Sequence, residues 1–402
     1  MRCCGLASRR ETPMPCVASA KFRCLLAALL LWAGAAAAEA QYHEGTLDGA
    51  DYLIGVPGDW NGGLVIYAHG YEGELPGRGN VQVSPLANYV TGKGIAWAAT
   101  GFRAVSYRPD WFLDDVLTLR AHIAGRFGAP RWTVIQGLSM GGHISVAALE
   151  LHPDKFQGAL VECGVVDGVG LVDWLYAYTA AAEYFSGVPL LDTPRPAFNT
   201  LVNERLVPAL GLPGSYTERG RAFDSVVKHL AGGDVPLRLE GLARRYLLNL
   251  NPREPGPQSA REFARHADTR HIRYAIDPGF GVDSETLNRD IRRIEPPPGA
   301  RSRAANPVFA ELTGRLQAPL MTIHESADFR VPLAIEQNYR RKVEAAGRGD
   351  RLVQRVVAGA GHCATPGPVR ERAFDDLLAW MDKGAKPEGD DVLGSVTAFG
   401  QW

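Results

Sequence analysis

The sequence predicts an α/β fold in which helices cover both faces of a doubly wound, mostly parallel sheet, with a largely helical insertion in the chain. Three observations support this fold class. Short apolar runs typical of buried strands alternate with longer helical patterns. This alternation stops after about Val166 and returns after about residue 306. A G-x-S-x-G pentapeptide lies between one apolar run and the helical pattern that follows it.

The elements before the break begin with a hairpin and continue as alternating strands and helices. Residues 45–57 alternate apolar and polar residues with small breaks, which suits a β-hairpin. The later elements are apolar strands at 63–68, 94–99, 131–136 and 159–163 and helices at 110–127 and 140–151. Strands and helices in this order form a parallel sheet with helices on both faces.

The elements after the break are a helical insertion and a second stretch of strand–helix alternation. Residues 167–305 contain helix-like stretches separated by Pro and Gly, and end in a Pro-rich, basic hinge at 296–305. Within them, S-Y-T-E at 215–218 has the form of a capping box that begins a helix. Strands are expected at 318–324 and 352–357, and helices at 333–346 and 369–381.

The first 40 residues have the pattern of a cleaved secretory signal peptide. Basic residues precede a continuous apolar run at 25–38, which ends at the small residues Ala38 and Ala40 that signal peptidase needs. The run has about 14 residues, and a membrane-spanning helix needs roughly 20. An uncleaved N-terminal anchor is the alternative. We expect a secreted or periplasmic mature chain that starts near Gln41.

The expected organisation therefore has five parts. They are a signal peptide at 1–40, a first core segment at 41–166, the insertion at 167–305, a second core segment at 306–383 and a Gly- and Asp-rich tail at 384–402.

The charge and cysteine counts limit the partners and the redox chemistry. The chain has 43 basic and 44 acidic residues, and without residues 1–40 it has 38 and 42, a net charge of −4. A nearly neutral chain is a poor candidate for nucleic-acid binding, which needs a basic face. Of six cysteines, only Cys163 and Cys363 lie beyond residue 40. Two cysteines in an exported protein favour one disulfide.

The strongest chemical signal is the pentapeptide Gly137-Leu138-Ser139-Met140-Gly141. The chain must turn sharply from strand to helix there and leave Ser139 in a strained conformation. Side chains at 137 and 141 would collide in such a turn, so both positions are glycine. Ser139 would then point out at the carboxyl end of the sheet as a nucleophile.

With this context the chain resembles the α/β-hydrolase superfamily, specifically its secreted serine esterases of the carboxylesterase and feruloyl-esterase type. The resemblance covers about residues 45–166 and 306–383, and G-L-S-M-G-G-H at 137–143 looks like the elbow of these enzymes. It implies an α/β-hydrolase sheet with the insertion as a helical cap between the strands that the superfamily numbers sixth and seventh. It also implies a catalytic triad in the order Ser, acid, His.

The resemblance places the acid at Asp328 and the base at His362. Residues 324–332, H-E-S-A-D-F-R-V-P, resemble the family's H-G-x-x-D-x-x-V-P segment, with Glu325 in place of the usual Gly. The rival acid is Asp167, just past the sixth strand, where some lipases place theirs. His362 lies in a Gly-rich loop after the last strand, and that loop can reach back over the sheet as a general base requires.

The developing oxyanion needs backbone donors, and two are expected. One is the N–H of Met140, directly after the nucleophile, and the other is the N–H of Tyr71, after His69-Gly70. We expect the His69 side chain to brace its loop and to take no part in the reaction.

A disulfide between Cys163 and Cys363 is a hypothesis that follows from the resemblance. Tannase and feruloyl-esterase relatives have a Cys just before the Ser and another just after the His, bonded together. Leu138 occupies the first of these positions here, so Cys163 would replace it and bond Cys363. Two buried free thiols are the alternative.

The start of the insertion is aromatic, with Trp174, Tyr176, Tyr178, Tyr184 and Phe185. These residues could form a pocket wall for an apolar or aromatic acyl group. The other interpretation is that they form the ordinary core of a helix.

These observations predict a serine carboxylic-ester hydrolase that acts on small-molecule or polymeric esters. We expect no cofactor and no metal, because the sequence has no G-x-G-x-x-G motif, no phosphate loop and no metal-ligand spacing around His266 and His271. The mature chain should have no stable membrane span, and the sequence does not indicate an oligomeric state. The alternatives are a peptidase of the same fold and a non-catalytic binding module on the same scaffold.

Overall fold

The computed structural model describes residues 40–253, 262–302, 304, 312–399 and 402. Except for Ala40, the predicted signal peptide at 1–40 therefore lies outside the described residues. The same holds for residues 254–261 of the predicted insertion and for the predicted start of the second core segment. Within the described ranges, no helix combines the length and the hydropathy that crossing a membrane requires.

The core is an eight-stranded sheet with the order β1-β2-β4-β3-β5-β6-β9-β10. β1 and β2 form the predicted antiparallel hairpin, β2 is antiparallel to β4, and the remaining neighbours are parallel. The prediction of a mostly parallel α/β sheet is therefore confirmed. The strands are β1 (Gln41–Leu47), β2 (Ala50–Val56), β3 (Gly63–Ala68), β4 (Ala96–Thr100), β5 (Trp132–Leu138), β6 (Gly158–Glu162), β9 (Leu320–Glu325) and β10 (Leu352–Val357).

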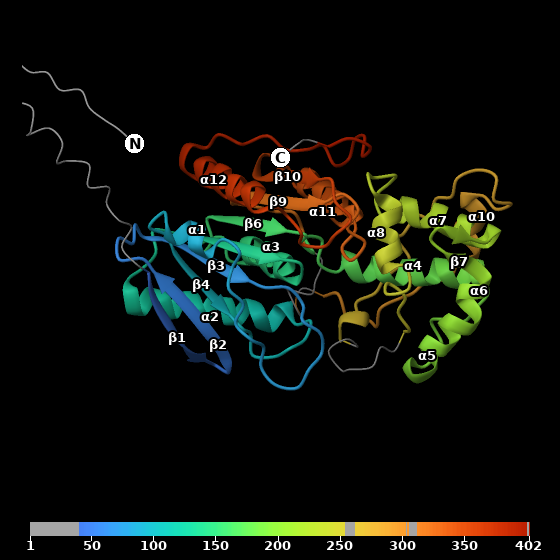
Figure 1. Cartoon of the computed structure of the whole chain (residues 1–402), viewed down its shortest axis with the longest axis horizontal. Helices are drawn as coiled ribbons and strands as arrows, with labels where there is room; N and C mark the ends of the chain where they lie inside the picture. Colours follow the sequence, from blue (N-terminus) through green and yellow to red (C-terminus); the bar gives the residue numbers. More distant parts are fainter. Residues whose placement is uncertain (1–39, 254–261, 303, 305–311, 400–401) are drawn as a thin grey trace, which may run out of the picture.

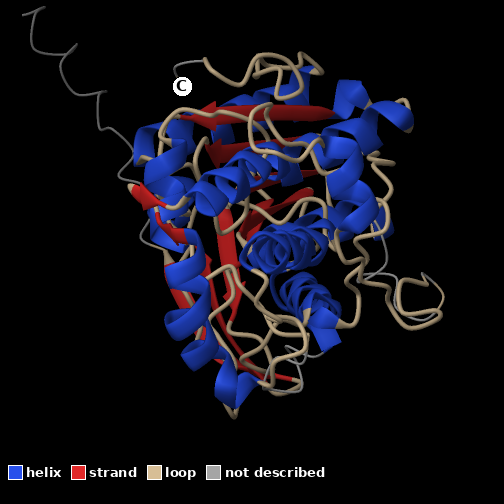
Figure 2. Ribbon diagram, turned by 90° about the vertical axis from the view of Figure 1, so that its right-hand side faces the viewer, coloured by secondary structure: helices blue, strands red, loops and turns tan. Residues whose placement is uncertain are grey.

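Helices cover both faces of this sheet, as Figure 2 shows. They are α1 (Ala87–Thr91), α2 (Pro109–Phe127), α3 (Met140–Leu151), α11 (Leu333–Ala345) and α12 (Gly367–Lys383). Successive side chains of β3 point to opposite faces. Leu64 and Ile66 pack in the cluster that contains α2, α3 and α11, and Val65 and Tyr67 pack in the cluster of α1 and α12. Burial on both sides explains why the central strands appear in the sequence as continuous apolar runs.

A group of helices lies between β6 and β9 in the chain and to one side of the sheet (Figure 1). The group consists of α4 (Gly170–Ser186), α5 (Arg195–Leu201), a π-helical turn (Val202–Leu206), α6 (Val207–Leu210), α7 (Glu218–Leu230), α8 (Arg238–Arg245) and α10 (Ser284–Asp290). We call it the helical segment. The hydroxyl of Tyr178 on α4 donates a hydrogen bond to the carbonyl of Tyr246 at 2.7 Å, and its ring packs on Phe223 of α7. Buried aromatic residues therefore hold the helical segment together.

The capping box predicted at residues 215–218 is wrong in its register. Thr217 is the N-cap of α7, and its hydroxyl accepts a hydrogen bond from the N–H of Gly220 at 3.1 Å. Ser215 instead pairs with Leu212 in the short hairpin of β7 (Gly211–Leu212) and β8 (Ser215–Tyr216). The turn between these strands contains Gly214 at φ +91°, a conformation that glycine adopts without strain. The hairpin therefore extends to Tyr216, and the helix begins two residues later than a cap at Ser215 would give.

A buried ion pair joins the end of β6 to α12. Both carboxylate oxygens of Glu162 lie 2.8 Å from Nε of Arg370, and Nε2 of Gln136 donates to Glu162 at 3.2 Å. The same guanidinium donates to the carbonyl of Thr365 at 3.0 Å. Because Glu162 is fully buried, removal of Arg370 would leave its carboxylate without an opposite charge.

We therefore expect the substitution Arg370→Met to reduce the free energy of unfolding by about 3–5 kcal/mol. Arg372→Met is the matched control, because Arg372 is exposed on the same helix and its loss should change stability by less than about 0.5 kcal/mol. Urea unfolding followed by circular dichroism measures both. Equal effects of the two substitutions would contradict this role of the pair.

Candidate active site

Ser139 is the single residue that connects β5, which ends at Leu138, to α3, which begins at Met140. Its backbone has φ 54° and ψ −115°, which is strained for a residue with a side chain. A Cβ at Gly141 would lie 1.9 Å from the carbonyl oxygen of Ala68, and one at Gly137 would lie 2.2 Å from the carbonyl oxygen of Gly141. The two glycines therefore allow the close packing that the turn requires.

The structure brings Ser139, His362 and Asp328 together, although they lie in three separate loops. Nε2 of His362 lies 2.9 Å from Oγ of Ser139, and Nδ1 of His362 lies 2.6 Å from Oδ2 of Asp328. The other oxygen of Asp328 accepts hydrogen bonds from the backbone N–H groups of Arg330 at 2.8 Å and Val331 at 3.2 Å. A carboxylate held in this way keeps the proton of the imidazole on Nδ1 and leaves Nε2 able to accept the serine proton.

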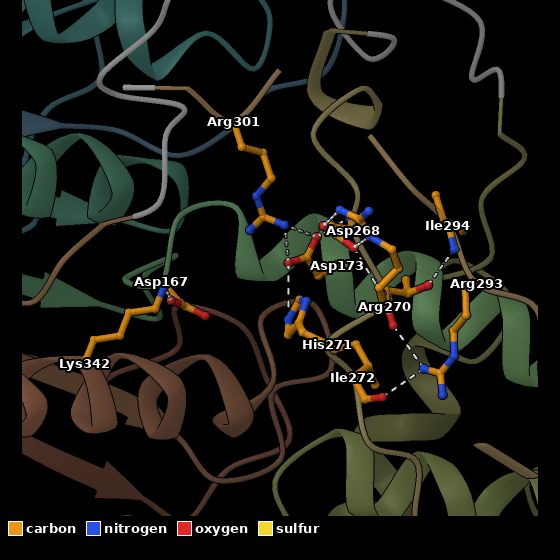
Figure 3. A network of polar contacts seen from close by, with 11 residues as sticks. Asp167, Asp173, Asp268, Arg270, His271, Ile272, Arg293, Ile294, Arg301 and Lys342 are labelled. Atoms are coloured by element: carbon orange, nitrogen blue, oxygen red, sulfur yellow. Dashed lines mark hydrogen bonds and ion pairs between the residues drawn. The ribbon is translucent and has the colours of Figure 1, made fainter. Parts of the chain in front are cut away.

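The rival acid, Asp167, has a different partner. Its Oδ1 lies 2.6 Å from Nζ of Lys342 on α11, as Figure 3 shows. Asp328, and not Asp167, accepts the hydrogen bond from Nδ1 of His362. Asp167 therefore ties the start of the helical segment to the core.

The two residues predicted to supply oxyanion donors lie close to Ser139: Met140 follows it, and Tyr71 lines the same cavity. Met140 is the first residue of α3, so its N–H has no intrahelical acceptor. Tyr71 follows Gly70, where an added Cβ would lie 3.2 Å from Cβ of Ser139. His69 is buried with Nδ1 2.8 Å from the carbonyl oxygen of Gly70, and burial lowers the pKa of its ring. This contact suits the expected bracing role of His69.

A disulfide joins Cys163, directly after β6, to Cys363, directly after His362, with the two Cα atoms 5.1 Å apart. Both residues have positive φ angles, 47° and 59°, at the points where their loops turn. The bond fixes the loop of His362 to the end of β6, the strand that pairs with β5 before Ser139. The disulfide also limits metal binding at this place. Cys163, His362 and Cys363 each offer one potential ligand atom, and these atoms lie within 4.8 Å of one another. Sulfur atoms bonded to each other are not thiolates and do not bind a metal as thiolates do.

The role of Glu325 was not predicted from the sequence, although its place in the segment at 324–332 was a signal. Its side chain is buried, and Oε1 accepts a hydrogen bond from the N–H of Ala364 at 2.5 Å. Burial is the main cause that raises the pKa of this carboxyl. Glu325 therefore holds the loop two residues after His362, a contact that glycine in the same position would lack.

A cavity of about 310 Å³ lies next to Ser139. Its walls are mainly apolar and aromatic, with Tyr71, Tyr107, Val165, Leu171, Leu175, Tyr176, Leu248, Phe263 and Val331. Of the five aromatic residues singled out in the insertion, Trp174, Tyr176, Tyr178 and Phe185 are buried in the core cluster, and Tyr176 also lines this cavity. Both interpretations of that aromatic run are therefore partly right. The cavity also contains Glu74, Arg245 and Arg330, which no motif indicated.

The disulfide generates a test. Replacing both Cys163 and Cys363 by Ala should lower the free energy of unfolding by about 2–5 kcal/mol. The disulfide joins residues 200 positions apart, so its loss increases the conformational entropy of the unfolded chain. Thermal unfolding measures the loss, and the reduced native protein should lose a similar amount. Two reactive thiols per chain in unfolded, unreduced protein would show that the bond does not form.

Comparison with known proteins gives distant relatives. No family model matches the sequence. An o-phthalyl amidase of Xanthobacter agilis is 21% identical to this chain. The alignment has a length of 420 residues and covers 86% of this chain and 88% of that protein. Among solved structures, the acylaminoacyl peptidase of Pyrococcus horikoshii is similar over 89% of this chain with 15% identity and a TM-score of 0.44, and this chain spans 44% of that protein's length. An esterase of Pyrococcus furiosus is similar over 85% of this chain and 92% of its own, with 13% identity and a TM-score of 0.44.

The topology itself defines the fold. An antiparallel hairpin leads into parallel strands in the order β4-β3-β5-β6-β9-β10, and the serine follows β5 in a strained turn to α3. This arrangement is the α/β-hydrolase fold.

Proposed function

We propose that the protein is a serine hydrolase that cleaves carboxylic esters through an acyl-enzyme intermediate. The observation that carries the proposal is the chain of hydrogen bonds from Asp328 through His362 to Ser139, next to a cavity of about 310 Å³. A serine hydroxyl becomes an effective nucleophile when a positioned base accepts its proton, and this geometry supplies the base.

The mechanism assigns one task to each group. Oγ of Ser139 attacks the ester carbonyl while Nε2 of His362 takes its proton, and Asp328 stabilises the imidazolium that forms. The N–H groups of Met140 and Tyr71 bind the oxyanion of the tetrahedral intermediate. His362 then donates its proton to the departing alcohol. A water molecule, activated by the same nitrogen, releases the acyl group as a carboxylic acid.

The walls of the cavity support a compact, partly aromatic substrate. Tyr107 and Phe263 are in contact, with ring centroids 4.4 Å apart, and Tyr176 adds a third ring. Leu171, Leu175 and Tyr176 belong to α4, so the helical segment acts as a cap that selects the substrate. Aromatic esters and the ends of polyester chains fit this description, and a polyester depolymerase is a narrower version of the same proposal.

Amide hydrolysis is the second candidate, and one observation favours it. The relative that is 21% identical over most of the chain is named as an amidase. The same triad can cleave an amide when His362 protonates the departing amine. A peptidase belongs to this alternative. A non-catalytic binding module has less support, because the three groups of the triad lie within hydrogen-bond distance of one another.

The proposal includes export of the mature chain to the periplasm or the medium. The signal-peptide pattern at residues 1–40 supports it, and so does a disulfide, because such bonds persist in oxidising compartments. N-terminal sequencing of the exported protein would test the expected start near Gln41.

The substitution Ser139→Ala should reduce kcat/KM for p-nitrophenyl esters by at least about 10⁴-fold, because it removes the nucleophile. Ser215→Ala is the control, since Ser215 is exposed in the distant β7–β8 hairpin and should keep full activity. Release of p-nitrophenolate gives both rates. Undiminished turnover by the Ser139 variant would refute the mechanism.

A panel of substrates separates the two candidate functions. We expect p-nitrophenyl and aryl esters to be cleaved with higher kcat/KM than the matching anilides, because an alkoxide or phenoxide leaves more readily than an amine. Peptide anilides and polyester films complete the panel, with Ser139→Ala as the blank. Faster cleavage of the anilides would assign the protein to the amidases.

A further inference from the structure

Arg245, the last residue of α8, lines the cavity next to Ser139 without an anionic partner in the described part of the chain. Its Nε is buried and makes no hydrogen bond among the described residues. The other arginines of α8 are paired: Arg244 with Glu240 at 2.7 Å, and Arg238 with Asp224 at 2.8 Å. Arg301 in the polar network of Figure 3 likewise pairs with Asp173 at 3.0 Å. A buried donor without a partner is costly, so Arg245 is suited to bind a group that the described residues do not supply.

Arg330 supplies a second positive charge to the same cavity. Its backbone N–H donates a hydrogen bond to Asp328, so the residue lies beside the triad. Its side chain is exposed and lines the cavity. Burial, and then the charge of Arg330, lower the pKa of Arg245, which places the two guanidinium groups within electrostatic range of each other. Arginine stays protonated in proteins. Two like charges in a partly buried site repel each other until an anion enters.

The carboxylates near this pair have other partners. Asp328 accepts hydrogen bonds from His362, Arg330 and Val331 through its two oxygens. Glu74, which also lines the cavity, accepts a hydrogen bond from the hydroxyl of Tyr71 at 2.9 Å. Among the described residues, the cavity wall is therefore mostly apolar and has two arginines, Arg245 and Arg330, against one carboxylate, Glu74.

We propose that Arg245 and Arg330 bind a carboxylate of the substrate, so that the enzyme prefers esters or amides with a free carboxylate near the scissile carbonyl. Guanidinium groups match carboxylates in geometry and form strong, charge-assisted hydrogen bonds. The aromatic wall around them suits a benzoic-acid-type body. This inference rests on the proposed serine-hydrolase function and adds the substrate class to it.

The carboxylate can belong to the acyl part or to the leaving group, and two pairs of substrates distinguish these sources. In the acyl pair, phenyl hydrogen isophthalate is compared with its analogue in which a carboxamide replaces the free carboxylate. In the leaving-group pair, 3-acetoxybenzoate is compared with 3-acetoxybenzamide. Each pair differs in charge at nearly constant shape, so the ratio of the two kcat/KM values, measured by release of the phenol, reports recognition of the carboxylate.

We expect the charged member of one pair to be preferred by about tenfold or more. Arg245→Gln and Arg330→Gln should each reduce that ratio about tenfold, and Arg245→Lys should restore part of it. Arg244→Gln is the matched control, because its side chain is 59% exposed on the same helix and should leave the ratio unchanged. Hydrolysis of both pairs without preference, or a preference that survives the double substitution Arg245→Gln/Arg330→Gln, would overturn the proposal and leave the serine-hydrolase function intact.

A binding measurement keeps the inference testable without turnover. Calorimetry should show that isophthalate binds the wild-type protein at least about tenfold more tightly than isophthalamide, and that Arg245→Gln removes this difference. Circular dichroism confirms that each variant is folded. If the protein cleaves neither pair and isophthalate still binds through Arg245, the proposed function fails and the carboxylate site stands. Equal binding of the two compounds would refute the site.

Discussion

The strained turn at Ser139 is the constraint on which the rest of the site depends. A residue held at φ 54° and ψ −115° costs about 1–3 kcal/mol, and the surrounding structure must hold it there. Close packing does so: Gly141 lies against the carbonyl of Ala68 at the end of β3, and Gly137 lies against Gly141 and Ser145. The same contacts bring the end of β3, with Gly70 and Tyr71 after it, up to the nucleophile. One packing arrangement therefore positions both the serine and the expected oxyanion donors.

The loop of His362 carries no regular structure, and three contacts hold the residues that follow His362. The disulfide joins Cys363 to the end of β6, Glu325 accepts the N–H of Ala364, and Arg370 donates to the carbonyl of Thr365. Because the loop after a strand is otherwise free to move, these contacts reduce the entropy that is lost when the imidazole aligns with Ser139. A small displacement of these residues would separate Nε2 of His362 from Oγ of Ser139.

The proposed catalytic groups and the proposed substrate-selecting groups belong to different parts of the chain. Ser139, Asp328 and His362 follow strands of the sheet, whereas Leu171, Tyr176 and Arg245 belong to the helical segment. Arg330 lies on the boundary, two residues after the acid. Chemistry and selectivity can therefore change separately, because substitutions in α4 or α8 alter the cavity without moving the strands that hold the triad.

The sequence by itself determined the features that local pattern controls. Apolar runs and their alternation with helices predicted the parallel sheet, and G-x-S-x-G between a strand and a helix predicted the turn at Ser139, because only glycine fits its crowded positions. The capping box at residues 215–218 failed in register, because the β7–β8 hairpin uses Ser215 for pairing. A motif of four residues contains no information about such pairing.

Contacts between distant segments were decided by the tertiary structure alone. Asp328 and Asp167 were both plausible acids in sequence order, and their partners, His362 and Lys342, lie outside either motif. Glu325 appeared only as a departure from a pattern, and its contact with Ala364 joins the end of β9 to the loop after β10. Arg245 is one of three arginines on α8, and only its buried Nε and its place in the cavity with Arg330 and Ser139 distinguish it. Such properties depend on which side chains approach each other in space, which periodicity along the chain does not specify.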